Sequence, residues 1–225
     1  MSKLLTILLM AVLLSACATQ QEYWIDEVKV RLFAESYTVK KDDTLYSIAW
    51  LYELDYRNLA QWNNIKAPNY LIYPGQKLRL KAPESATLPV KIAPRKAVKP
   101  SGWQWPLDNP EVKQLPSSNA VFMKGTPSEA VHAVANGTVV YSGFNLKHYR
   151  GLIIIKHEND VFSVYGHNKE VFVAEKEQVE SGQEIARLSD QQDDAKLYFE
   201  LRQANKLLKL ANYLPNIKVS ISDVH

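Results

Sequence analysis

The apolar positions of this 225-residue chain follow three different patterns. In the first, Lys3 precedes a largely apolar run over residues 4–14, which ends in the small residues Ser15 and Ala16. A charged start, an apolar stretch of this length and small residues at its end are typical of a secretory signal peptide. The run is also shorter than the roughly 20 residues that a bilayer-spanning helix needs. We therefore predict a signal peptide over residues 1–16.

The second pattern covers residues 37–80 and predicts the order strand, helix, helix, strand. Residues 37–39 are aromatic and β-branched, and residues 77–80 alternate after the turn signal Pro74-Gly75. Between them, a second helix is predicted over residues 55–62. The first helix is indicated by apolar residues at i, i+3, i+4 and i+7: Leu45, Ile48, Ala49 and Tyr52.

The third pattern, over residues 102–215, consists of short apolar segments separated by turn residues. Strands are predicted over residues 131–135, 138–142, 152–157, 161–166 and 197–202. Asn136-Gly137 predicts a hairpin between the first two, because both residues favour positive φ. Ile153-Ile154-Ile155 is an unbroken apolar run and indicates a buried strand. The predicted fold class is α+β and multidomain, with a small βααβ module before a mainly antiparallel β domain.

The two folded regions are joined by residues 81–101, which show no sustained period. This segment contains four prolines and five basic residues, which predict an extended, semi-rigid linker. Its charge suits either a solvated spacer, which we favour, or contact with an anionic surface. Residues 216–225 form a predicted tail. The formal net charge of +3 gives no basic patch of the kind that nucleic-acid binders carry.

The chain has one cysteine, Cys17, so an internal disulfide is excluded. Leu14-Ser15-Ala16-Cys17 resembles a bacterial lipobox, and the resemblance implies cleavage before Cys17 and acylation of that residue. Residues 17–36 would then be a tether to lipid, and Ala18 in place of aspartate favours the outer membrane. The alternative is that Cys17 is only a small residue near an ordinary cleavage site.

Residues 37–80 resemble a LysM module through Tyr37-Thr38-Val39, Asp43-Thr44-Leu45, Asn63-Asn64-Ile65 and Ile72-Tyr73-Pro74-Gly75-Gln76. The family implies binding to the glycan strands of peptidoglycan. Asp42 departs from the glycine usual before Asp-Thr. The predicted sugar-binding residues are Asp43, Thr44, Leu45, Asn64, Ile65, Tyr70 and Ile72. For Leu45, Ile65 and Ile72 a core position is an equal alternative.

Residues 102–215 resemble a LytM, or lysostaphin-like, metallopeptidase domain. The resemblance rests on Trp103-Gln104-Trp105-Pro106, residues 131–141, residues 153–157, Tyr165-Gly166-His167-Asn168, residues 182–186 and Phe199-Glu200-Leu201-Arg202. Active members hold zinc with two histidines and an aspartate, leaving one position open for water. In this chain the three ligand positions and the position of an assisting histidine fall on Ser118, Phe122, Lys196 and Tyr198. Of the residues that carry the chemistry in the family, only His167 is retained. We therefore predict no metal, no cofactor and no catalysis.

A lipoprotein signal, one LysM module and a degenerate LytM domain together resemble the NlpD-type murein hydrolase activators. The resemblance implies a protein at the periplasmic face of the outer membrane, concentrated at the division site, that activates a periplasmic zinc amidase. The candidate residues of its partner-binding groove are Tyr149, Arg150, Tyr165, His167, Lys196, Tyr198 and Glu200. Strand packing for Tyr165 and Tyr198, and an ion pair with Arg202 for Glu200, are equal alternatives.

Two other functions remain open from the sequence. An active zinc endopeptidase would need a metal site that the residues above do not supply. A purely structural anchor between membrane and wall would need only Cys17 and the LysM module, and it would leave the β domain unexplained.

Overall fold

The computed structural model describes residues 34–83, 102–108, 110–114, 119–146 and 149–215. The predicted signal peptide, Cys17, most of the linker, Ser118 and the tail lie outside these ranges. Within them, no helix has the length and apolar character needed to cross a membrane.

The N-terminal module has the predicted βααβ order: β1 (Ser36–Thr38), α2 (Leu45–Leu51), α3 (Tyr56–Trp62) and β2 (Lys77–Arg79), with β1 antiparallel to β2. Thr44 caps α2 in a capping box with Ser47, and the Asp55 side chain caps α3 by accepting from the Arg57 amide. These bonds satisfy amides that have no partner inside the helix. The two helices and the β2 strand bury Leu45, Ile48, Leu59 and Leu78, which are at most 1% exposed.

The C-terminal domain is built from strands, all of whose described pairings are antiparallel. The large sheet has the order β10-β6-β7-β8-β12-β4-β3, with β13 beside β12, and a small sheet has the order β5-β11-β9. The strands are β3 (Glu111–Gln114), β4 (Val121–Lys124), β5 (Ala130–His132), β6 (Gly137–Gly143), β7 (Gly151–Lys156), β8 (Val161–Asn168), β9 (Glu170–Val171), β10 (Gln178–Val179), β11 (Glu184–Arg187), β12 (Lys196–Gln203) and β13 (Lys206–Leu207). Single 3-10 turns cover Glu158–Asp160, Gln192–Asp194 and Leu210–Asn212.

The predicted hairpin at Asn136-Gly137 is wrong. β5 pairs with β11 in the small sheet, whereas β6 pairs with β7 and β10 in the large one. Asn136 and Gly137 therefore lie where the chain passes from the small sheet to the large sheet. Gly137 is needed there for space, because a Cβ at this position would lie 2.6 Å from Ile155 Cγ2 and 2.7 Å from the Lys156 carbonyl oxygen.

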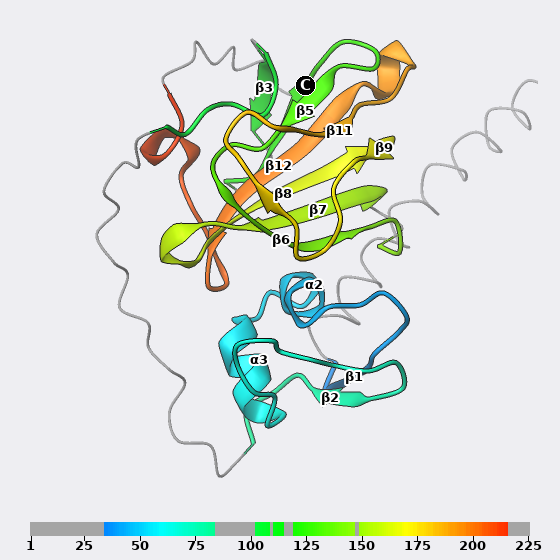
Figure 1. Ribbon diagram of the computed structural model, residues 1–225, viewed down its shortest axis with the longest axis vertical. Coiled ribbons are helices and arrows are strands. Elements are labelled where there is room, and N and C mark those ends of the chain that lie inside the picture. Colours follow the sequence, from blue (N-terminus) through cyan, green and yellow to red (C-terminus); the bar gives the residue numbers. More distant parts are fainter. Residues whose placement is uncertain (1–33, 84–101, 109, 115–118, 147–148, 216–225) are drawn as a thin grey trace, which may run out of the picture.

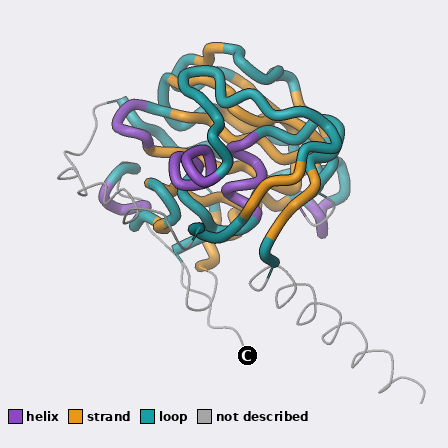
Figure 2. Tube along the Cα trace, turned by 90° about the horizontal axis from the view of Figure 1, so that it is seen from below, coloured by secondary structure: helices purple, strands orange, loops and turns teal. Residues whose placement is uncertain are grey.

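The large sheet is covered on both faces, as Figures 1 and 2 show. Ile153 and Ile155 of β7 point to the core shared with the small sheet, and Leu152 and Ile154 point to the core shared with the N-terminal module. An unbroken apolar run is what a strand buried on both sides requires, since successive side chains point to opposite faces. The prediction of a buried strand is confirmed, and the second covering layer is the N-terminal module.

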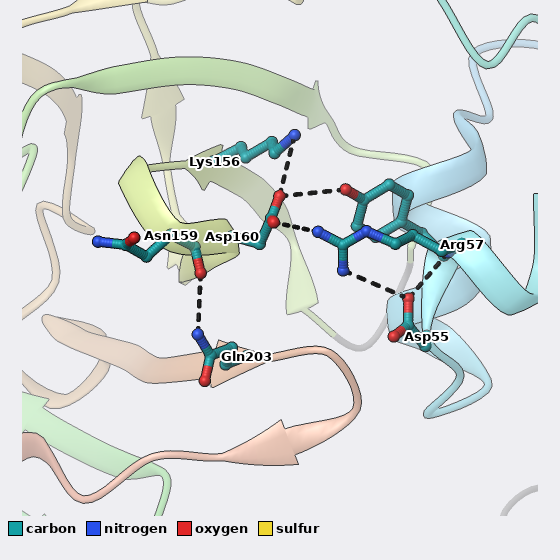
Figure 3. Close-up of polar contacts among 7 residues, drawn as sticks. Asp55, Arg57, Lys156, Asn159, Asp160 and Gln203 are labelled. Atoms are coloured by element: carbon teal, nitrogen blue, oxygen red, sulfur yellow. Dashed lines mark hydrogen bonds and ion pairs between the residues drawn. The ribbon is translucent and has the colours of Figure 1, made fainter. Parts of the chain in front are cut away.

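A polar cluster at the rim of this contact joins the two parts (Figure 3). The Tyr56 hydroxyl donates to Asp160 Oδ1 over 3.2 Å, and Arg57 forms an ion pair with Asp160. Lys156 Nζ lies 3.2 Å from the same carboxylate. Asp160, at the turn before β8, thus binds two residues of α3.

Candidate functional site

The candidate site lies on the face of the large sheet that also meets the N-terminal module. Along β12, Leu197, Phe199 and Leu201 enter the inner core, so the alternate residues Lys196, Tyr198, Glu200 and Arg202 point to the other face. The register sets Tyr198 directly opposite Phe122 of β4 and Gly166 of β8. Three positions that are distant in the sequence are thereby brought together.

His167 joins this group through an unusual backbone conformation. Strict alternation along β8 would send it to the same side as Tyr165, but its φ of 68° breaks the pattern, and its ring packs edge-on against Phe122 with centroids 5.3 Å apart. Positive φ is uncommon outside glycine and is often found at functional sites. Burial lowers the pKa of His167, and the nearby charges of Lys196 and Arg150 lower it further. The imidazole is therefore neutral at pH 7.

Aromatic rings and basic groups complete the surface. Tyr198 packs against Phe122 at 5.7 Å and against Tyr149 at 5.3 Å between ring centroids. Lys196 Nζ lies 5.8 Å from the centre of the Phe122 ring, within cation–π range. Beside them runs an open cleft lined by Phe144, Arg150, His167, Asn168, Lys169, Ser189, Asp190, Gln191 and Asp194. Arg150 forms an ion pair with Asp194 there.

The described residues at the predicted zinc positions do not fit zinc. Phe122 offers only ring carbons and Lys196 an ammonium group. Burial, followed by the charge of Glu200, raises the pKa of the Tyr198 phenol, so it stays protonated. His167 Nδ1 is buried and lacks a hydrogen-bond partner, but one imidazole is short of the three protein ligands that a catalytic zinc takes. No set of three His, Cys, Asp or Glu side chains in the described ranges is arranged to hold a metal.

Two predicted groove residues are fully buried. Tyr165 is fully buried in the inner core, where its hydroxyl accepts from the Val134 amide over 3.0 Å. Glu200 is on the groove face but is 0% exposed, and it accepts from Arg202 Nε over 2.6 Å and from the Tyr198 hydroxyl over 2.8 Å. The packing alternative holds for Tyr165, and the ion-pair alternative holds for Glu200.

The predicted sugar-binding residues differ in their surroundings. Leu45 is 1% exposed, so the core alternative holds for it and its side chain does not reach a ligand. The Asp43 carboxylate accepts from the Tyr37 hydroxyl over 2.8 Å and from the Lys40 amide over 2.7 Å. Asn64 is exposed, whereas the remaining four are partly buried: Thr44, Ile65, Tyr70 and Ile72.

Comparisons with known proteins place the chain in a family. Residues 37–81 match the LysM domain, and residues 117–210 match peptidase family M23. Lipoprotein NlpD/LppB homolog of Pseudomonas aeruginosa is 33% identical over 229 residues, which cover 80% of this chain and 76% of that protein. This chain belongs to the NlpD/LppB lipoprotein family.

This chain is also similar to Murein hydrolase activator NlpD of Escherichia coli. It is 28% identical over 257 residues, covering 80% of this chain and 68% of that protein. Among solved structures, a putative peptidase M23 from Pseudomonas aeruginosa is similar with a TM-score of 0.42 and 14% identity, covering 48% of this chain and 47% of that one. The matches to the LysM domain and to peptidase family M23 confirm the predicted combination of a LysM module with a LytM-type domain.

Sequence reasoning missed the contact between the LysM module and the M23 domain of this NlpD/LppB protein. Trp50 Nε1 donates to Glu200 Oε1 over 2.5 Å, and the rings of Tyr46 and Tyr56 pack on Phe162. The sequence did contain a signal, because Trp50 lies outside the face of α2 that Leu45, Ile48 and Ala49 bury in the core of the LysM module. A tryptophan there indicates a second buried surface.

Proposed function

We propose that this protein is a non-catalytic activator of a periplasmic N-acetylmuramoyl-L-alanine amidase. This proposal rests above all on the strand register, which sets Tyr198 opposite Phe122, whose ring packs on His167. The positions where a metallopeptidase needs ligands hold an aromatic and basic surface, which suits binding and not hydrolysis. The name of the relative Murein hydrolase activator NlpD supports the same role.

Activation requires that the groove bind the open form of the amidase more tightly than the closed form, because a partner with equal affinity for both shifts nothing. The proposed contact residues are Tyr149, Arg150, His167 and Lys196, which are partly or fully exposed on or beside the cleft. Tyr198 is 8% exposed and would support them through its ring contact with Tyr149. Aromatic and arginine side chains are frequent anchors of protein interfaces. Tyr165 and Glu200 would act only by supporting this surface.

The remaining parts of the chain would hold the groove, and with it the bound amidase, next to the peptidoglycan that the amidase cleaves. Acylated Cys17 would hold the protein at the periplasmic face of the outer membrane. The LysM module would bind glycan strands through its two loops, with Asn64, Ile65, Tyr70 and Ile72 as the side chains that the fold leaves accessible or partly so. Concentration at the division site would follow from the glycans present there.

The test is dye release from labelled peptidoglycan by the chain from residue 17 with Cys17→Ser, alone and with a periplasmic zinc amidase. We expect release only when both proteins are present. EDTA-sensitive release by this chain alone would establish an endopeptidase and overturn the proposal. No release with any periplasmic amidase of the same organism would favour a structural anchor.

Matched lysine variants locate the effect. Lys196→Ala removes a charge from the groove, whereas Lys209→Ala removes an exposed one beside the last 3-10 turn. We expect Lys196→Ala to reduce stimulation severalfold and Lys209→Ala to leave it unchanged. Equal effects of the two would show that net charge, and not the groove, attracts the amidase.

A further inference from the structure

The LysM module touches the candidate groove through one continuous line of side chains. Trp50 of α2 donates to the buried Glu200 and packs on Tyr149, with ring centroids 4.6 Å apart. Tyr149 in turn packs on Tyr198, at the centre of the degenerate site. Tyr198 in turn packs on Phe122, so a residue of the LysM module is three ring contacts from Phe122.

The LysM module also contacts the chain just after β6, at Asn145. Asn145 Nδ2 donates to the Lys41 carbonyl oxygen over 3.3 Å and to Asp42 Oδ2 over 3.4 Å. On either side of these contacts, Phe144 and Arg150 line the cleft that contains His167. The loop residues that face the cleft are thus fixed by residues that face the LysM module.

The contact between the modules is buried and closely packed. Tyr56 is 5% exposed and Phe162 is 7% exposed, and the Phe162 ring packs on the rings of Tyr46 and Tyr56. Separation would expose these rings to water and would remove the Trp50 donor from a carboxylate that is 0% exposed.

We propose that the LysM module stays docked against the M23 domain and forms one side of the partner-binding groove. Trp50 and Asn145 are then positioning residues that hold Tyr149 and Arg150 in place for the partner. The inference rests on the proposed function of the groove and adds how the site is built. The module stays docked while the partner binds. Peptidoglycan capture and partner binding are therefore performed by one rigid body.

The first experiment locks the modules together. Cysteines are introduced as Asp42→Cys and Asn145→Cys in the chain with Cys17→Ser, which has no other cysteine, and they are joined with a short bis-thiol cross-linker. We expect efficient cross-linking and unchanged stimulation of the amidase relative to the untreated double variant. Loss of stimulation on cross-linking would show that the module must leave the groove, and failure to cross-link would show that it is not docked.

The second experiment removes the anchor. Trp50→Ala should lose most of the stimulation, because Tyr149 loses its ring partner and Glu200 its donor. Trp50→Phe keeps the ring and should lose less. Trp62→Phe is the matched control, since Trp62 lies in α3 beside a cleft formed within the LysM module by Asn63 and Arg79. Greater stimulation by Trp50→Ala than by the parent chain would overturn the proposal.

Rescue separates positioning from folding. Joining residues 42 and 145 in the Trp50→Ala background restores docking but not the ring partner of Tyr149, so stimulation should return in part. A chain that is merely misfolded would not recover, and absence of rescue would count against the positioning role. If the parent chain stimulates no amidase, the proposed function fails, whereas the cross-linking yield still reports independently whether the modules are docked.

Discussion

Acidification from pH 7 to pH 5 should weaken the M23 domain through one buried histidine. His157 is 5% exposed, and burial lowers its pKa to about 4. Its Nδ1 lies 2.8 Å from the Asn136 carbonyl oxygen, so this nitrogen carries the proton, and Nε2 accepts from the Ser163 hydroxyl over 2.6 Å. The folded domain therefore holds the neutral ring.

The magnitude follows from the difference between the two states. In the unfolded chain the imidazole has its ordinary pKa of about 6.5 and takes up a proton below that pH, whereas in the folded chain it does so only near pH 4. The contribution of His157 to stability is thus complete above pH 6.5 and is lost as the pH falls toward 4. Between pH 7 and pH 5 the loss is about 2 kcal/mol.

Urea unfolding followed by tryptophan fluorescence at pH 7 and pH 5 measures this loss. His157→Gln removes the titrating group, so the fall in unfolding free energy should be about 2 kcal/mol smaller in the variant than in the parent chain. Other groups, including His167, titrate in both chains and cancel in the difference. Identical pH dependence of the two chains would refute a buried neutral His157.

Three further changes have expected outcomes. Glu200→Gln should lower the unfolding free energy by about 3 kcal/mol, because Arg202, whose side chain is 11% exposed, then keeps only the 4.0 Å contact with Glu53, and adding Arg202→Met should restore part of the loss in urea unfolding. Asp160→Asn should cost about 1 kcal/mol and its effect should shrink with salt, since the side chain is 33% exposed; Asp190→Asn, which removes a more exposed pair with Lys169, is the comparison. Leu45→Ala should destabilise the protein by about 3 kcal/mol in thermal unfolding, and a loss of glycan binding without any loss of stability would contradict its core position.

The sequence alone determined the modules and much of their local structure. The spacing of Leu45, Ile48 and Ala49 specifies which side of α2 is buried, because the helical period relates residues only a few positions apart. Alternation along β12 likewise assigns Tyr198 and Glu200 to one face.

Only the tertiary structure decided how these pieces meet. Asn136-Gly137 has the composition of a hairpin turn, but β5 and β6 pair in different sheets, because strand pairing depends on partners far along the chain. The backbone of His167 leaves the alternating pattern, which no periodicity reveals. Glu200 lies on the groove face and is still buried, because Trp50, 150 residues away in the sequence, covers it. Local patterns encode which side of an element is buried, and long-range packing selects what buries it.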